Sequence, residues 1–209
     1  MTEEFHKPTL FSGPRFEDYE GGADPAQISH VAHDTAQALL SRVRHDPRSE
    51  IVDRVISFAD EHGIDDIAEL WSRASPRSLP GALWRIYLMR AFIRQDAEEC
   101  SFLYQRGSEL LATIDPVVAG APTPTGPAEI TALADQILRG LFEGDFAGAL
   151  DRAAAFCRVT ATGATSIADD SELSNPGRAT ELTTRAYRLT QTAAEFSSCA
   201  RLFRADSLD

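Results

Sequence analysis

The chain has 209 residues, of which 43% are hydrophobic and 25% are charged, and these proportions are those of a globular protein. Thirty-two Asp and Glu residues outnumber twenty Lys and Arg residues, so the formal net charge at pH 7 is −12. Because this charge repels phosphate groups at long range, nucleic acids and anionic membranes are not expected as partners. No apolar run reaches the roughly 20 residues that a membrane-spanning helix requires.

Three cysteines are spread through the chain, and no two of them form a CxxC pair. An odd number of distant cysteines does not form a closed set of disulfides, so we expect Cys100, Cys157 and Cys199 to be buried free thiols. Free thiols are typical of a reducing compartment. Residues 1–7 are acidic and lack the apolar stretch of a secretory signal, so the expected location is the cytoplasm.

Residues 1–23 are predicted to form an extended arm, because prolines and glycines recur along them. The arm also carries large apolar side chains, which indicates that it lies on a protein surface. We expect that surface to belong to its own domain, and the alternative is that the arm docks on a partner. The apolar residues are Phe5, Leu10, Phe11, Phe16 and Tyr19.

From residue 24 onward the pattern is helical. Asp24-Pro25 and Asp46-Pro47 each place a capping residue before a proline at the first helical position. Apolar residues then recur at steps of three and four, which predicts helices over 24–42 and 46–63. A short helix is expected over 65–74.

Ser78 and Asp96 are predicted to cap two further helices. The helix after Ser78 is apolar on nearly every side over 79–93, and such a helix is usually central, with neighbours all around it. The helix after Asp96 is expected to continue to about residue 111.

The clearest interruption of the helical pattern falls at 112–126, where prolines and glycines are concentrated. It predicts a linker between two sub-bundles, 24–111 and 127–209. In the second sub-bundle, helices over 127–141 and 146–163 are separated by a short turn, so we expect an antiparallel hairpin.

An acidic polar loop is predicted after this hairpin, at 169–172. Three carboxylates in four residues could attract a divalent cation, but the spacing of an EF-hand is absent. We therefore expect a solvated loop.

The strongest periodic signal lies over 179–203, where small and large apolar residues alternate at steps of three and four. The alanines allow a close approach of another helix, and the large residues form a seam that packs by knobs into holes. This pattern predicts either an internal bundle helix or an interface with a second copy or another protein. The large seam residues are Leu182, Leu189, Phe196 and Phe203.

Glycine-rich nucleotide-binding motifs and the nucleophile elbow of hydrolases are absent from the sequence. The best metal candidate places His30, His33 and Asp34 at i, i+3 and i+4 on one helix, with His62 as a fourth ligand from a neighbouring helix. Because the HExxH and repeated ExxH patterns are missing, the structural alternative is favoured for these histidines. We expect no cofactor.

Aromatic and arginine side chains are concentrated around residues 71–90. Trp71, Trp84, Arg85 and Arg90 are of the types that dominate binding hot spots, so they are candidate ligand- or partner-binding residues. For Trp84, as for Tyr87, packing within a helical core is the favoured interpretation, and binding is the alternative. A guanidinium on an apolar helix requires a carboxylate partner or a ligand anion, which directs attention to Arg85 and Arg90.

Two segments carry resemblances. Residues 144–150 (GDFAGAL) resemble the turn between paired helices of tetratricopeptide repeats, although no period of about 34 residues runs through the chain. Residues 78–90 (SLPGALWRIYLMR) and 144–158 (GDFAGALDRAAAFCR) resemble a family of uncharacterised actinobacterial proteins. That resemblance implies an intracellular all-helical domain and supplies no catalytic residues.

Together these patterns predict an all-α protein, a single bundle of about seven or eight helices over 24–209 preceded by the extended arm. The expected function is that of a non-enzymatic cytosolic scaffold or adaptor that acts through protein–protein contacts or self-association. The alternative is a small-molecule-binding or metal-dependent enzyme with a site between the helical sub-bundles.

Overall fold

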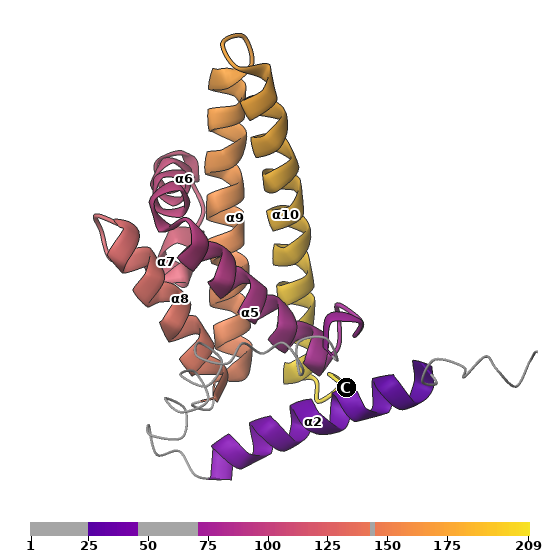
Figure 1. Cartoon of the computed structure of the whole chain (residues 1–209). Coiled ribbons are helices and arrows are strands. Elements are labelled where there is room, and N and C mark those ends of the chain that lie inside the picture. The colour runs from indigo at the N-terminus through magenta and orange to yellow at the C-terminus, as the bar shows by residue number, and fades with distance from the viewer. Residues whose placement is uncertain (1–24, 46–70, 143–144) are drawn as a thin grey trace, which may run out of the picture.

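The computed structural model describes residues 25–45, 71–142 and 145–209 (Figure 1). Within these ranges the chain forms seven α-helices and no strand, which confirms the all-α class for the part described. None of these helices is long and apolar enough to cross a bilayer. The helices are α2 (Pro25–His45), α5 (Leu79–Gln95), α6 (Ala97–Leu110), α7 (Asp115–Ala119), α8 (Pro127–Phe142), α9 (Phe146–Ser171) and α10 (Pro176–Arg204).

The longest feature is an antiparallel hairpin made by α9 and α10, of 26 and 29 residues (Figure 1). α6, α7 and α8 pack against α9, and α5 crosses the hairpin to contact α8 and α10. α2 lies against α5 and α8. Apart from α9, the described helix that α10 contacts most is α5, so the placement of α5 decides how much of α10 is covered.

Side-chain caps define the helix starts that the sequence predicts at Ser78 and Asp96. The Ser78 hydroxyl accepts a hydrogen bond from the Gly81 N–H at 3.3 Å, and the Asp96 carboxylate accepts one from the Glu99 N–H at 3.0 Å. Each cap satisfies an N–H group that has no partner within its helix. The caps of α9 and α10 are Asp145 and Asn175.

The core is centred on α9, which has neighbours on most of its sides and a high content of buried alanine. α6 crosses α9 at two glycines, Gly107 of α6 and Gly163 of α9. A Cβ atom on either glycine would lie 1.8 Å from a backbone carbonyl oxygen of the other helix. The two backbones are therefore in direct contact, and only glycine fits at both positions.

The predicted linker at 112–126 contains a short helix, α7. Asp115 at its start accepts hydrogen bonds from Nε and Nη2 of Arg158 on α9, at 2.9 and 2.6 Å. This charge-assisted pair holds the segment against the core, so the segment is ordered although it is rich in proline and glycine.

The acidic loop predicted at 169–172 is mostly helical, because α9 continues to Ser171. Ala164 and Ala168 are buried, so the apolar stripe of the helix continues into this region. Tertiary packing thus overrides the local polar composition.

Three sequence predictions lie outside the described residues. They are the arm at 1–23, the helix at 46–63 and the greater part of the helix at 65–74.

Candidate functional site

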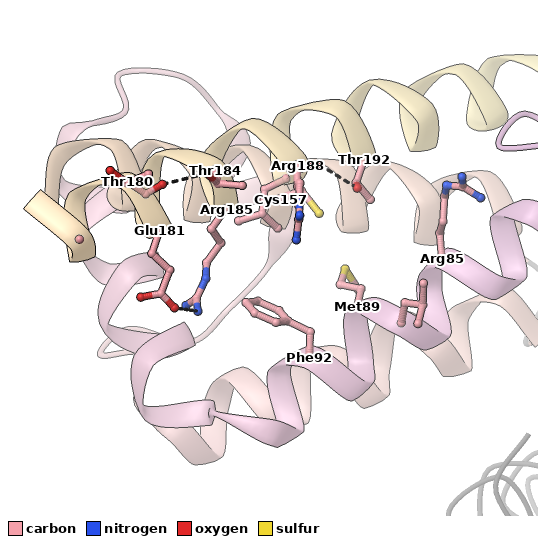
Figure 2. A pocket seen from close by; sticks show the side chains of 13 residues that line it. Arg85, Met89, Phe92, Cys157, Thr180, Glu181, Thr184, Arg185, Arg188 and Thr192 are labelled. Carbon is pink, nitrogen blue, oxygen red and sulfur yellow. Dashed lines mark hydrogen bonds and ion pairs between the residues drawn. The ribbon is translucent and has the colours of Figure 1, made fainter. Parts of the chain in front are cut away.

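A groove with a volume of about 770 Å³ runs between α5 and α10 (Figure 2). Along α10 its lining extends from Gly177 to Thr192, which corresponds to about 22 Å at 1.5 Å per residue. α9 contributes one described residue, Cys157. The lining comprises Arg85, Leu88, Met89, Phe92, Cys157, Gly177, Thr180, Glu181, Thr184, Arg185, Arg188, Leu189 and Thr192.

The apolar wall of the groove belongs mainly to α5. Phe92 follows Met89 by three residues and Leu88 by four, so it shares a side of α5 with both of them. The sequence predicts that α5 is covered on all sides, but Leu88 is 45% exposed and Phe92 is only partly buried. The arrangement of the helices explains this exposure: α5 starts near the C-terminal end of α10 and runs obliquely away from it across α9 (Figure 1), so α10 does not cover the whole length of α5.

The opposite wall is a row of threonines on α10. The Thr184 hydroxyl donates to the carbonyl oxygen of Thr180, and the Thr192 hydroxyl donates to that of Arg188, both at 2.9 Å. The donor of each hydroxyl is thus used within the helix. An apolar ligand next to this wall therefore leaves neither hydroxyl donor without a hydrogen bond.

Two arginines of the lining are held by glutamates. Arg85 Nε donates to Glu195 Oε2 at 2.5 Å, which links α5 to α10. Farther along the groove, the guanidinium of Arg185 lies 5.3 Å from the centre of the Phe92 ring and pairs with Glu99 of α6. Both pairs fix the position of the walls and neutralise their charge.

A third arginine of the lining, Arg188, has no ion-pair or hydrogen-bond partner for its side chain within the described part of the chain. Figure 2 shows it reaching from α10 toward α5. The neighbouring charges are already matched, because Glu99 and Glu181 both bind Arg178 and Arg185. Together with the pair between α5 and α10, four arginines in and beside the groove face three glutamates among the described residues, so one positive charge there, that of Arg188, has no described counter-ion.

The thiol at the groove is not a reactive one. Burial raises the pKa of Cys157 to about 12, although the neighbouring Arg158 acts in the opposite direction. The thiol therefore stays protonated at neutral pH and is a poor nucleophile. As the sequence predicts, all three cysteines are free and buried.

The candidate binding arginines have different environments. Arg85 lines the groove. Arg90 does not, because it points to the other side of α5, is 3% exposed and donates from Nε to Asp135 Oδ1 of α8 at 2.7 Å. Its buried charge is matched by a carboxylate within the protein, so Arg90 joins two helices of the core.

The two candidate tryptophans lie outside the described groove lining. The indole N–H of Trp71 donates to Thr35 Oγ1 at 3.1 Å, which ties α2 to the segment before α5. Trp84 stacks on Tyr87, with the ring centroids 5.7 Å apart. The structure therefore brings neither ring together with Arg85 in one lining.

Two of the three candidate metal-binding histidines are described. His30 Nδ1 lies 2.9 Å from the Asp34 carboxylate, and His33 Nδ1 lies 2.7 Å from the carbonyl oxygen of Ser29. His62 lies outside the described residues. Among the residues that are described, no three His, Cys, Asp or Glu side chains are grouped so that they could hold a metal ion.

Three of the four large seam residues of α10 are buried within a single chain, where α10 packs along α9. Leu182 and Phe196 are fully buried, and Leu189 is 9% exposed. Phe203 is partly buried, and its ring centroid lies 4.6 Å from that of Phe146. This packing along α9 is the arrangement that the internal alternative predicts, and contact of the seam with a second copy or another protein stays a prediction.

Sequence reasoning did not identify Leu88, Phe92 or Arg188 as groove residues. Nothing in the local pattern distinguishes an apolar residue of α5 that is covered by a neighbour from one that is not. One signal in the sequence could have indicated the groove, namely the row of threonines on α10. Threonine is a mediocre helix former, and these threonines lie outside the apolar seam positions.

No protein-family model matches the chain, and no curated protein or solved structure is significantly similar to it. A function must therefore be inferred from the chemistry of the groove.

Proposed function

We propose that this protein is a binding protein that holds an apolar or amphipathic small molecule in the groove between α5 and α10. One observation carries the proposal, namely a cavity of about 770 Å³ that is lined by Leu88, Met89, Phe92 and Leu189 and is open between two helices. Pockets for small ligands usually have volumes of roughly 300–1,000 Å³ and mainly apolar walls with a few polar groups.

The groove favours binding over chemical reaction. Its thiol is protonated, and Glu181 is engaged by two arginines. The described lining residues include no histidine and no pair of carboxylates that could act as acid and base. This proposal combines the non-enzymatic character expected from the sequence with the expected site between the two sub-bundles.

A groove-filling variant tests the proposal. Thr184→Phe adds a ring to the exposed wall of the groove, and Thr190→Phe makes the same change on α10 at a position outside the lining. We expect the neutral dye Nile red to bind the wild-type chain and the Thr190→Phe variant with equal affinity, and to bind Thr184→Phe at least about tenfold more weakly. Equal binding to all three proteins would refute the groove as the binding site.

A scaffold function is the second candidate, and a separate observation favours it. Ile114 and Val117 in and beside α7 are 75% and 82% exposed, and Leu110 at the end of α6 is 49% exposed. Exposed apolar residues that lie close in sequence favour a protein contact, and a second copy of the chain is the simplest partner. Sedimentation equilibrium should then show a dimer that Val117→Glu dissociates, whereas a monomeric wild-type chain would rule the dimer out.

A further inference from the structure

We propose that the ligand of the groove is an aliphatic carboxylate, with its carboxylate bound by Arg188 and its chain lying along Met89 and Phe92. This inference rests on the proposed function, because it names the ligand class of the same groove. Two features carry it, the one unmatched positive charge and the continuous apolar wall beside it.

The unmatched charge specifies a single anionic group. Of the arginines at the groove, Arg85 is bound by Glu195, and Arg178 and Arg185 are bound by Glu99 and Glu181. The side chain of Arg188 therefore remains as the one cation of the described lining that is available to a ligand. A guanidinium presents parallel N–H donors that match the two oxygens of a carboxylate.

The charge of the whole molecule narrows the ligand further. A formal net charge of −12 repels polyanions at long range, and this repulsion grows with the charge of the ligand. A phosphate monoester carries a charge of about −1.5 to −2 near neutral pH, whereas a carboxylate carries one charge. One surplus guanidinium on an acidic protein therefore suits a monoanion.

The apolar wall specifies the rest of the ligand. Met89 and Phe92 lie on α5 across the groove from Arg188 (Figure 2), and Leu189 also lines the groove. The threonine hydroxyls already donate to carbonyl oxygens of their own helix, so a ligand needs no polar groups there. A hydrocarbon chain fits this part of the groove because it has no polar groups that would lack a hydrogen-bond partner there.

A chain-length series tests the apolar part. Octanoate, decanoate and dodecanoate are titrated into the full chain by calorimetry, below their micelle concentrations and at constant ionic strength. We expect the affinity to rise by up to about fourfold for each added methylene, because burial of each methylene contributes to binding. An affinity that does not depend on chain length would overturn the inference.

The role of Arg188 is tested by removing the charge from the ligand and, separately, from the protein. Dodecanol, the neutral counterpart of dodecanoate, should bind the wild-type chain about tenfold more weakly, and Arg188→Gln should lower the affinity for dodecanoate by about the same factor. Arg188→Gln should leave dodecanol binding unchanged. Arg201→Gln is the matched control, since Arg201 is exposed on the same helix and lies outside the described groove lining.

The outcomes separate this inference from the proposed function. If dodecanol and Nile red bind in the groove but dodecanoate has no advantage, the carboxylate assignment fails and the apolar groove stands. If none of these three compounds binds, both proposals fail.

Vesicles of phosphatidylglycerol distinguish a free ligand from a lipid headgroup. We expect that the protein does not co-sediment with these vesicles. Co-sedimentation that Arg188→Gln abolishes would overturn the assignment to a free carboxylate.

Discussion

At the scale of single residues, the contact between Gly107 and Gly163 is the least tolerant feature of the described core. Each glycine lies where a Cβ would come within 1.8 Å of a backbone carbonyl oxygen, and a backbone atom cannot rotate away as a side chain can. A methyl group at either position must therefore push α6 and α9 apart along their contact.

We predict that Gly163→Ala lowers the free energy of unfolding by about 3 kcal/mol, because overpacking at a rigid contact separates the two helices. Gly177→Ala is the control, since a Cβ there would lie 3.8 Å from the nearest atom, the side-chain oxygen of Asn175. That variant should be unchanged or more stable by about 0.5 kcal/mol. Urea denaturation of the two variants gives the comparison, and equal stability would show that α6 and α9 are not in backbone contact.

A second residue-scale feature is the carboxylate of Asp115, which anchors α7 to α9. Hydrogen bonds from Arg158 hold its pKa below the usual value of 3.8. For a group whose pKa is lowered by folding, the stabilisation is fully present above the pKa of the unfolded chain. It is lost as the pH falls through the lower pKa of the folded state.

We therefore predict that Asp115→Asn lowers the thermal midpoint at pH 7, and that the difference from the wild-type chain shrinks as the pH falls below about 4. The exposed pair between Arg106 and Asp170 supplies the control, and Asp170→Asn should change the midpoint little at any pH. A difference for Asp115→Asn that stays constant down to pH 3 would contradict the role of the ionised carboxylate.

At the scale of helices, α10 has two faces with different roles, one packed on α9 and one lining the groove. Its seam of small and large apolar residues packs along α9, while its threonines and Arg188 face the groove. Threonines and serines give the helix little intrinsic stability, so burial of the seam must hold it in place.

The variant Phe196→Ala tests whether burial of the seam stabilises α10, because it removes a fully buried ring from the seam. We predict a loss of about 3–5 kcal/mol in the free energy of unfolding. Phe203→Ala should have a smaller effect because Phe203 is only partly buried near the end of the helix. Chemical denaturation with a parallel mass measurement is the check, and an equal effect of both variants would show that burial in the seam does not determine the stability of α10.

At the scale of the whole molecule, the three cysteines report on the integrity of the core. Burial raises the pKa of Cys100 and Cys157 to about 12 and that of Cys199 to about 11. The thiols lie on three different helices, so they become accessible together only if the described bundle opens as one unit.

We predict that the native protein is not alkylated by iodoacetamide at pH 8 and that all three thiols react at the same urea concentration as the loss of helical circular dichroism. Rapid reaction of one cysteine in native buffer would show that its helix opens independently. Mass spectrometry of the intact protein counts the modified thiols directly.

The amino-acid sequence by itself determined the helices of this protein. The caps at Ser78 and Asp96 and the period of 179–203 are local signals, since a helix start or an apolar stripe depends on residues within a few turns. Two features differ from the prediction: 112–126 contains the helix α7, and α9 continues to Ser171. In both places contacts with distant residues outweigh local composition.

Only the tertiary structure decided where a ligand could bind. Leu88 and Arg188 are 100 positions apart, and their joining in one groove depends on the angle at which α5 leaves α10. That angle is set by packing throughout the bundle, including the partly buried ion pair of Arg90 and Asp135 between α5 and α8. A periodic pattern shows which face of a helix is apolar, but whether another helix covers that face is a property of the assembled fold.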